Sequence, residues 1–263
     1  MSRAMKAHDI IRPDFFIAGF HKCATFSMYH NLNKHPQIDM GQFKEPLTFA
    51  RDYHWSDIDR VYRKHYAPGR GKMLGDSNVY NSVVKYVPER IRMCNPRAKI
   101  IFMVRNPVDR IYTQWRHLCR LRPGTEVNNF PAVIERAKED FDLNRFELER
   151  DYVPTMCRRW NNYHRMYLEI GCYDYYISHW ERYFEDILVI NFDDYVKDPD
   201  MTYAVVQGFL GVPYVELKRE DRNMDDWHGE VYSKHPEIAG ELEYFYESWN
   251  KKMEARGISW ETK

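Results

Sequence analysis

The sequence predicts an α/β fold of three layers, in which a central parallel sheet has helices on both faces. Two observations predict this class. Short apolar runs alternate along the chain with longer segments of helical periodicity, an order typical of parallel strands joined by crossover helices. The 263 residues also contain no repeat, low-complexity stretch or Pro/Gly/Ser-rich linker, so residues 1–263 are expected to form a single domain with a full core.

The expected strands are short apolar runs with many aromatic and β-branched residues, the composition of strands buried inside a sheet. In chain order they cover 15–20, a stretch near 72–75, 99–104 and 187–192. Because helical segments separate them, neighbouring strands should run parallel.

The expected helices lie between and after these strands. Met28 and Leu32 stand one turn apart behind the first strand, and Pro107 suits the first turn of the helix that follows the strand 99–104. The helices cover 25–34, 82–93, 107–121, a helical middle that ends near 185, and an amphipathic helix over 241–253. Residues 121–153 are polar and charge-rich; they form either a lid or cleft segment, or a solvated excursion.

The segment behind the first strand combines the features of an anion site. A tight stretch that holds Lys22, Thr25 and Ser27 leads from the strand into a helix. Backbone N–H groups at the helix start, the helix dipole and the Lys22 charge all favour a phosphate-like group there. The pattern Gly-x-x-x-x-Gly-Lys-[Ser/Thr] does not occur, so the usual Mg-ATP arrangement is not expected. The alternative is an ordinary helix start with a solvated lysine.

A second strand, turn and helix follow at 99–117. Arg105 closes the strand, where open α/β sheets bind ligands, and Thr113 lies on the next helix. A surface ion pair would explain Arg105 alone, and a helix-surface position would explain Thr113 alone. Neither explains the combination with the first motif.

Together these two segments resemble those of the sulfotransferases that use 3′-phosphoadenosine 5′-phosphosulfate (PAPS). The family's 5′-phosphosulfate loop corresponds here to Lys22-Cys23-Ala24-Thr25-Phe26-Ser27, and its 3′-phosphate segment to Val104-Arg105-Asn106-Pro107 with Thr113 at the serine position. Two residues depart from the pattern. Ala24 replaces the usual glycine and can still offer its N–H if the turn needs no positive φ. Phe26 replaces a small hydroxyl residue, so the loop should rely more on backbone amides and Ser27.

Further motifs in the same order extend the resemblance to the bacterial and heparan-sulfate-type branch. Lys44-Glu45-Pro46-Leu47-Thr48-Phe49 is similar to its Glu-x-x-Phe-Phe element, and Gly75-Asp76-Ser77 to its Gly-Glu-Lys/Ser element, with Ser77 where part of the branch has lysine. The closing pattern is matched by Gly171-Cys172-Tyr173, Trp180, Phe184, the strand 187–192, Asp198-Pro199 and Phe209-Leu210-Gly211. Ser233-Lys234-His235-Pro236 resembles the basic loop that closes over the nucleotide.

The resemblance implies a P-loop-like fold and a sulfuryl transfer that leaves adenosine 3′,5′-bisphosphate (PAP), with no metal. It places donor binding at Lys22, Cys23, Ala24, Thr25, Phe26, Ser27, Arg105, Thr113, Lys234 and His235. Sulfuryl transfer is an in-line displacement in which charge develops on the sulfuryl oxygens and the leaving phosphate, so positioning and electrostatics dominate. We expect Lys22 to stabilise the bridging oxygen as the bond breaks.

Three residues compete as the base that takes the acceptor's proton. Glu45 matches the family position, although a surface pair with Lys44 would also explain it. His54 has aromatic neighbours in sequence that suit an acceptor pocket. His21 lies beside Lys22, where nearby positive charge should keep it neutral.

The acceptor is expected to be a cytosolic small molecule, such as a secondary metabolite, with a hydroxyl or an amine to modify. The chain has 20 Tyr, 14 Phe and 7 Trp, some of which could line an aromatic pocket, although ordinary core packing explains most of them. Acidic residues near the expected cleft argue mildly against a polyanionic glycan. Acceptor contacts are expected from His21, Tyr53, Trp55, Asp76 and Trp115. A glycan or lipid-linked sugar is the second possibility.

Composition excludes other classes. With 39 basic and 39 acidic residues the formal charge is zero, which argues against a nucleic-acid binder. No apolar run is long enough to span a membrane, and the start lacks a signal-peptide core, so a cytoplasmic protein is expected. The five cysteines show no Cys-x-x-Cys spacing, as in a reduced protein without structural zinc. Cys23 is either a reactive thiol with a lowered pKa or, as we favour, an incidental loop residue. The oligomeric state is not predicted.

Two hypotheses from other classes stay open. A P-loop phosphotransferase shares the strand–loop–helix order, but it should carry Gly-Lys-[Ser/Thr] and depend on magnesium. A catalytically silent nucleotide-binding module would bind the donor without turnover. The presence of Lys22, Glu45 and Arg105 together speaks against it.

Overall fold

The computed structural model describes residues 11–50, 55–66, 72–121, 129–143, 166–220 and 229–260. Within them, five strands form one sheet in the order β2-β3-β1-β4-β5, and every neighbouring pair is parallel. The strands are β1 (Phe15–Gly19), β2 (Ile38–Asp39), β3 (Met73–Ser77), β4 (Lys99–Val104) and β5 (Ile187–Asn191). The predicted α/β class with a central parallel sheet is confirmed.

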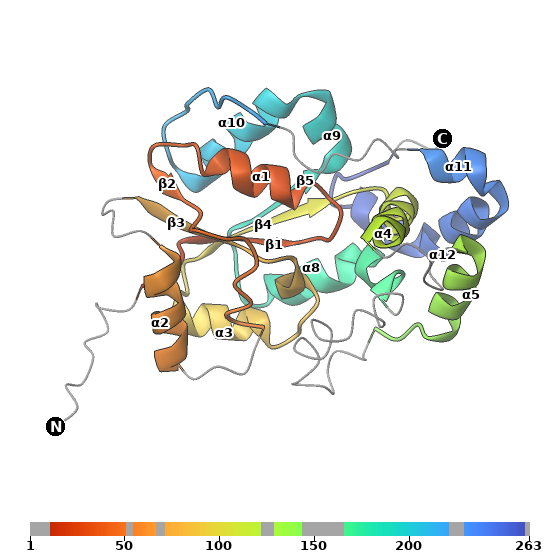
Figure 1. The fold of residues 1–263 in the computed structure, drawn as a ribbon, viewed down its shortest axis with the longest axis horizontal. Coiled ribbons are helices and arrows are strands. Elements are labelled where there is room, and N and C mark those ends of the chain that lie inside the picture. Colours follow the sequence, from red (N-terminus) through yellow and green to blue (C-terminus); the bar gives the residue numbers. More distant parts are fainter. Residues whose placement is uncertain are drawn as a thin grey trace.

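Helices lie on both faces of this sheet. Figure 1 shows α1, α9 and α10 on one side and α2, α3 and α8 on the other, with α4, α5, α11 and α12 gathered at one end. Their bounds are α1 Thr25–Leu32, α2 Trp55–His65, α3 Val87–Cys94, α4 Pro107–Leu121, α5 Phe130–Glu139, α8 Tyr173–Glu181, α9 Phe192–Lys197, α10 Pro199–Leu210, α11 Glu230–Lys234 and α12 Pro236–Glu254, with 3₁₀ turns η2 Val79–Ser82 and η5 Glu169–Gly171.

The sheet positions the two sequence motifs beside each other. All five residues of β1 are buried, and β1 lies between β3 and β4. Because parallel strands end at the same edge, the loop after β1 and Arg105 after β4 come together at the carboxyl end of the sheet. The Phe20 N–H donates to the Met103 carbonyl at 2.9 Å, which carries the β1–β4 connection to the start of that loop.

Gly19 allows η2 to approach this loop closely. A Cβ on Gly19 would lie 2.6 Å from the Cβ of Ser82, closer than two carbon atoms can approach without displacement. Any larger residue would therefore push η2 away from the carboxyl end of β1.

Two of the predicted helix boundaries are wrong. The helix predicted over 82–93 begins only at Val87, as α3, because Pro88 lacks an N–H and fits only the first turn of a helix. The last helix begins at Pro236 rather than at 241, again with the proline in its first turn. The elements β2, α2, α9, α10 and α11 were not predicted. Among the described helices, none is long and apolar enough to cross a membrane.

Candidate functional site

The first part of the site is the start of α1. Ala24 occupies the position before the helix with φ 61° and ψ 17°, in the left-handed region, and no side chain caps the helix. The amides of the first turn therefore have no capping side chain and can donate to a ligand, with the helix dipole behind them. By sequence, Ala24 is expected to replace the usual glycine without strain if the turn needs no positive φ, but the turn does need one. An alanine in this region costs about 1–2 kcal/mol relative to ordinary φ.

Cys23 lies behind this loop and does not face a ligand. It is completely buried, its thiol donates to the His21 carbonyl at 3.4 Å, and its Sγ lies 3.8 Å from the Tyr173 hydroxyl. Burial raises the pKa of the Cys23 thiol to about 11. The alternative of a reactive thiolate with a lowered pKa is therefore wrong, because desolvation outweighs the nearby positive charges.

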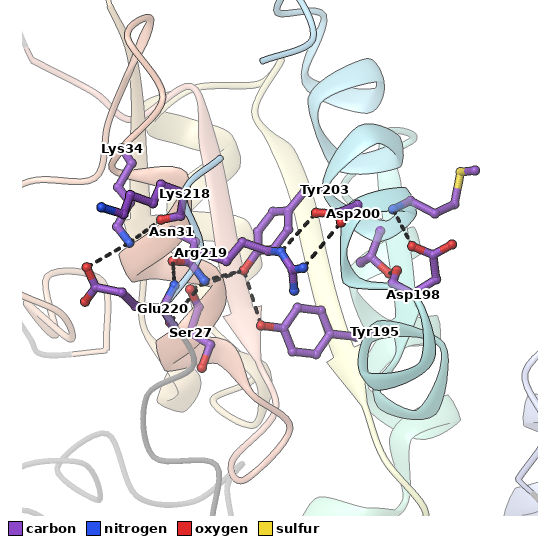
Figure 2. A network of polar contacts seen from close by, with 12 residues as sticks. Ser27, Asn31, Lys34, Tyr195, Asp198, Asp200, Tyr203, Lys218, Arg219 and Glu220 are labelled. Carbon is purple, nitrogen blue, oxygen red and sulfur yellow. Dashed lines mark hydrogen bonds and ion pairs between the residues drawn. The ribbon is translucent and has the colours of Figure 1, made fainter. Parts of the chain in front are cut away.

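A polar network joins α1 to α10 and to the segment around Glu220 (Figure 2). The Asn31 amide donates to the Tyr203 hydroxyl of α10 at 2.9 Å, and that hydroxyl contacts the Ser27 carbonyl at 3.4 Å. Asn31 also exchanges two hydrogen bonds with the backbone of Glu220, at 2.9 and 3.2 Å. Arg219 in turn pairs with Asp200 of α10 at 2.9 Å. The helix that offers its amides is thus held on two sides.

Arg105 and Thr113 form the second part of the site. The Arg105 guanidinium is 3% exposed and lies 4.3 Å from the centre of the Phe192 ring. Burial lowers the pKa of Arg105, and the negative charge of Asp109 raises it. Thr113, also buried, donates to the Asp109 carbonyl at 2.8 Å. A bound phosphate would find a largely desolvated cation here, where charge–charge attraction is stronger than in water.

The segment with Lys234 and His235 packs against α4. The Asn106 amide donates to the Tyr232 hydroxyl at 3.1 Å, and the Gly229 N–H donates to the Asp109 carboxylate at 2.9 Å. Lys234 pairs with Glu230 at 2.7 Å. The structure thus brings this segment next to the Arg105 motif. The Lys234 ammonium is paired with the Glu230 carboxylate.

Glu45 lies in a loop bound to the end of β3. Its N–H donates to the Ser77 carbonyl at 2.9 Å, and its carboxylate is 2.6 Å from the Lys44 ammonium. In the described residues, the non-glycine positions with positive φ are Lys22, Ala24, Glu45 and Leu47. Such backbone costs about 1–3 kcal/mol per residue and tends to gather at functional sites. Here all four positions fall in the two motifs expected to hold donor and base.

Asp76 is a buried carboxyl beside this loop. The Tyr62 hydroxyl donates to its Oδ2 at 2.7 Å. Burial raises the pKa of Asp76 to about 7; the Tyr62 bond and the Lys44 charge lower it, and the Glu45 charge raises it. Burial also holds the pKa of His21 well below its ordinary value, with Lys44 and Lys22 adding to the effect. His21 is therefore neutral, as expected, but mainly because of desolvation.

A sulfotransferase domain model matches residues 12–241 of this chain. The chain belongs to the sulfotransferase domain family.

Relatives of this sulfotransferase domain are distant. It is 25% identical over 227 residues to a bifunctional heparan sulfate N-deacetylase/N-sulfotransferase 2 of Bos taurus, covering 81% of this chain and 24% of the relative. It is 23% identical over 259 residues to carbohydrate sulfotransferase 15 of Mus musculus, covering 79% and 45%. The chain therefore spans less than half of the length of these curated relatives.

Two solved structures share the fold. A sulfotransferase from Alicyclobacillus acidocaldarius superposes with a TM-score of 0.64 at 23% identity, covering 91% of this chain and 99% of its own. A mouse sulfotransferase in complex with PAP superposes with a TM-score of 0.51 at 16% identity, covering 79% and 62%.

Of the residues expected to contact the acceptor, the structure describes the side chains of His21, Asp76 and Trp115. Tyr53 and His54 lie outside the described residues, and Trp55 begins α2 with a side chain that is likewise outside them. Trp115 is buried against Phe130 and His235, with ring centres 5.1 and 6.1 Å away. Its surroundings are those of the segment around Lys234, not of the Glu45 loop.

Sequence reasoning missed three residues that shape this site. Tyr62 binds Asp76, Phe192 lies against Arg105, and Tyr173 donates to the Arg105 carbonyl at 2.8 Å. Only Tyr173 and Phe192 stood in recognised motifs, and a motif does not show which partner a side chain meets. Within the described part of the chain, no group of three or more His, Cys, Asp or Glu side chains is placed to hold a metal ion.

Proposed function

We propose that this chain is a sulfotransferase that moves a sulfuryl group from PAPS to a hydroxyl or amine of a small-molecule acceptor. The observation that carries the proposal is the meeting of two cationic positions at one edge of the sheet. The loop before α1, with Lys22 and amides that no side chain caps, is linked to the buried Arg105 by Tyr173, whose hydroxyl contacts both the Cys23 Sγ and the Arg105 carbonyl. A donor with a phosphosulfate at one end and a 3′-phosphate at the other needs two such positions.

The chain's residues fit this donor. The loop Lys22–Ser27 would hold the phosphosulfate through the amides of the first turn and the Lys22 ammonium. Arg105 and Thr113 would hold the 3′-phosphate, and Lys234 with His235 would cover the nucleotide after Lys234 leaves Glu230. Cys23 and Ala24 would contact the donor only through their backbone, because the Cys23 side chain is buried behind the loop and Ala24 forms the turn.

In the reaction, the acceptor oxygen or nitrogen attacks sulfur in line with the bridging oxygen. Lys22 stabilises the charge that develops on that oxygen as the bond to sulfur breaks. Glu45 takes the proton from the acceptor, and its pairing with Lys44 holds its carboxylate in place until then. His54 remains the second candidate for the base. His21 is the third candidate; because it is buried, it could take the acceptor's proton only if its surroundings rearranged to expose it.

A small, polar or cationic acceptor is supported by the Asp76 carboxyl beside the Glu45 loop. Asp76 and His21 would contact it, together with Tyr53 and Trp55. Trp115 is better explained as packing for the His235 segment. A glycan acceptor is favoured by one observation, the heparan sulfate and carbohydrate sulfotransferases among the relatives. A cytoplasmic location suits the described cysteines, all of which are free thiols.

The test is a thermal-shift comparison of PAP with AMP, ADP and ATP, followed by an acceptor screen with PAPS. PAP should stabilise the protein far more than AMP, and stabilisation at one hundred times the dissociation constant should be about 2.7 kcal/mol. Equal shifts with AMP would refute the 3′-phosphate assignment. Preference for Mg-ATP would favour a phosphotransferase, and PAP binding without turnover on either acceptor class would favour a silent binding module.

A further inference from the structure

Tyr173 stands between the two segments of the proposed donor site. It opens α8 and is completely buried, 150 residues after Cys23 and 68 after Arg105. Its hydroxyl donates to the Arg105 carbonyl at 2.8 Å and lies 3.8 Å from the Cys23 Sγ. The hydroxyl proton is used by the Arg105 carbonyl and the Cys23 thiol proton by the His21 carbonyl, so the 3.8 Å contact between the hydroxyl and Sγ is a weak one.

The Tyr173 ring completes this contact. It packs edge-on against the ring of Phe20, the first residue after β1, with centres 4.7 Å apart. Main-chain bonding between β1 and β4 extends to the Phe20 N–H and the Met103 carbonyl. Beyond that pair, the Tyr173 hydroxyl connects the residue after β4 with the loop, through the Arg105 carbonyl and the Cys23 Sγ.

We propose that the Tyr173 hydroxyl is a positioning group that fixes the spacing between the loop Lys22–Ser27 and Arg105. This inference rests on the proposed donor site. A ligand with phosphates at both ends benefits only if both segments are held at the matching distance, whereas a ligand with one phosphate is insensitive to it. Tyr173 therefore sets how strongly a bisphosphate outcompetes a monophosphate.

The chain offers two matched controls for Tyr173→Phe. Tyr246 is a completely buried tyrosine whose hydroxyl donates to the Leu168 carbonyl at 2.6 Å, and Leu168 belongs to neither donor segment. Tyr246→Phe therefore removes a buried hydrogen bond from a tyrosine hydroxyl to a backbone carbonyl, outside the proposed donor site. Tyr176 lies on α8 as well, packs near Phe20, and its hydroxyl has no hydrogen-bond partner among the described residues. Tyr176→Phe removes a hydroxyl from the same helix without breaking a bond.

The experiment measures PAP and AMP affinity by calorimetry on the full chain, together with unfolding of the unliganded protein. Tyr173→Phe should lower the PAP-over-AMP affinity ratio about tenfold, which corresponds to about 1.4 kcal/mol. Tyr246→Phe should lose comparable stability, and both control variants should keep the wild-type ratio. If Tyr173→Phe does not fold, Cys23→Ala removes the other contact of the hydroxyl and should lower the ratio in the same direction.

The possible outcomes separate the two proposals. A wild-type protein that binds AMP as well as PAP overturns the donor site and the positioning role with it. A wild-type preference for PAP that Tyr173→Phe or its Cys23→Ala substitute leaves intact overturns the positioning role alone. An equal fall of the ratio in Tyr246→Phe also overturns it, because the effect would then come from lost stability.

Discussion

Ala24→Gly should stabilise the unliganded protein. Ala24 has φ 61°, a conformation that costs an L-residue about 1–2 kcal/mol and glycine nothing. Against this stands the greater freedom of glycine in the unfolded chain, which costs about 0.4–1 kcal/mol. The difference predicts a net gain of up to about 1.5 kcal/mol, or a rise in Tm of roughly 2–5 °C for a chain of this size.

The assay is denaturant unfolding without ligand, with Ala137→Gly as the matched control. Ala137 is completely buried in α5, where φ is helical, so the same substitution should destabilise by about 1 kcal/mol or more. The two variants should therefore differ in sign. If Ala24→Gly destabilised as much as Ala137→Gly, the left-handed turn before α1 would not store strain, and the reasoning for this loop would be refuted.

Three further predictions concern chemistry and pH. Glu45→Gln should lower turnover by about 10²-fold or more and leave PAP affinity unchanged, whereas Lys22→Ala should lower both turnover and PAP affinity. If Glu45→Gln kept normal turnover and His54→Ala lost it, His54 would be the base. Turnover should persist in excess EDTA, because Lys22 and the start of α1 supply the positive charge; a loss that magnesium restores would contradict this. Asp76 keeps its proton to about pH 7 in the fold but only to about 3.8 when unfolded, so its contribution to stability, complete below 3.8, is lost as pH rises through 7. Denaturant midpoints of wild type relative to Asp76→Asn should therefore fall between about pH 4 and 7, and a flat difference would show an ordinary pKa.

The sequence was sufficient for the parts of the fold that rest on local pattern. The runs that became β1, β4 and β5 are apolar, and the helix after β4 begins at a proline, so their identity follows from burial and from backbone chemistry. β2 has only two residues and carries no periodic signal. The boundary errors at Pro88 and Pro236 show that a proline inside an apolar pattern outweighs the pattern.

The candidate site was predictable in its motifs but not in its contacts. Sequence alone indicated Lys22 and Arg105, which follow apolar runs, and Glu45, which matches a motif of the family, although their roles remain predictions. The burial of Cys23 and the positive φ of Ala24 depend on how the loop turns, which no residue type dictates. The partners Tyr62 and Tyr173 come from distant elements, so only the fold reveals them. That residues 1–263 act as one domain also remains a prediction.

The place of β1 between β3 and β4 has a consequence for how such a chain can change. The residues proposed to hold the donor follow β1 and β4 or pack beyond them, whereas Glu45 and Asp76 belong to the β2–β3 flank. Substitutions on that flank would change the proposed acceptor side, while the proposed nucleotide side keeps its own strands, loop and supporting network. If the two sides are assigned correctly, the sheet order separates them, so that the acceptor side could diverge in evolution without changes to the nucleotide side.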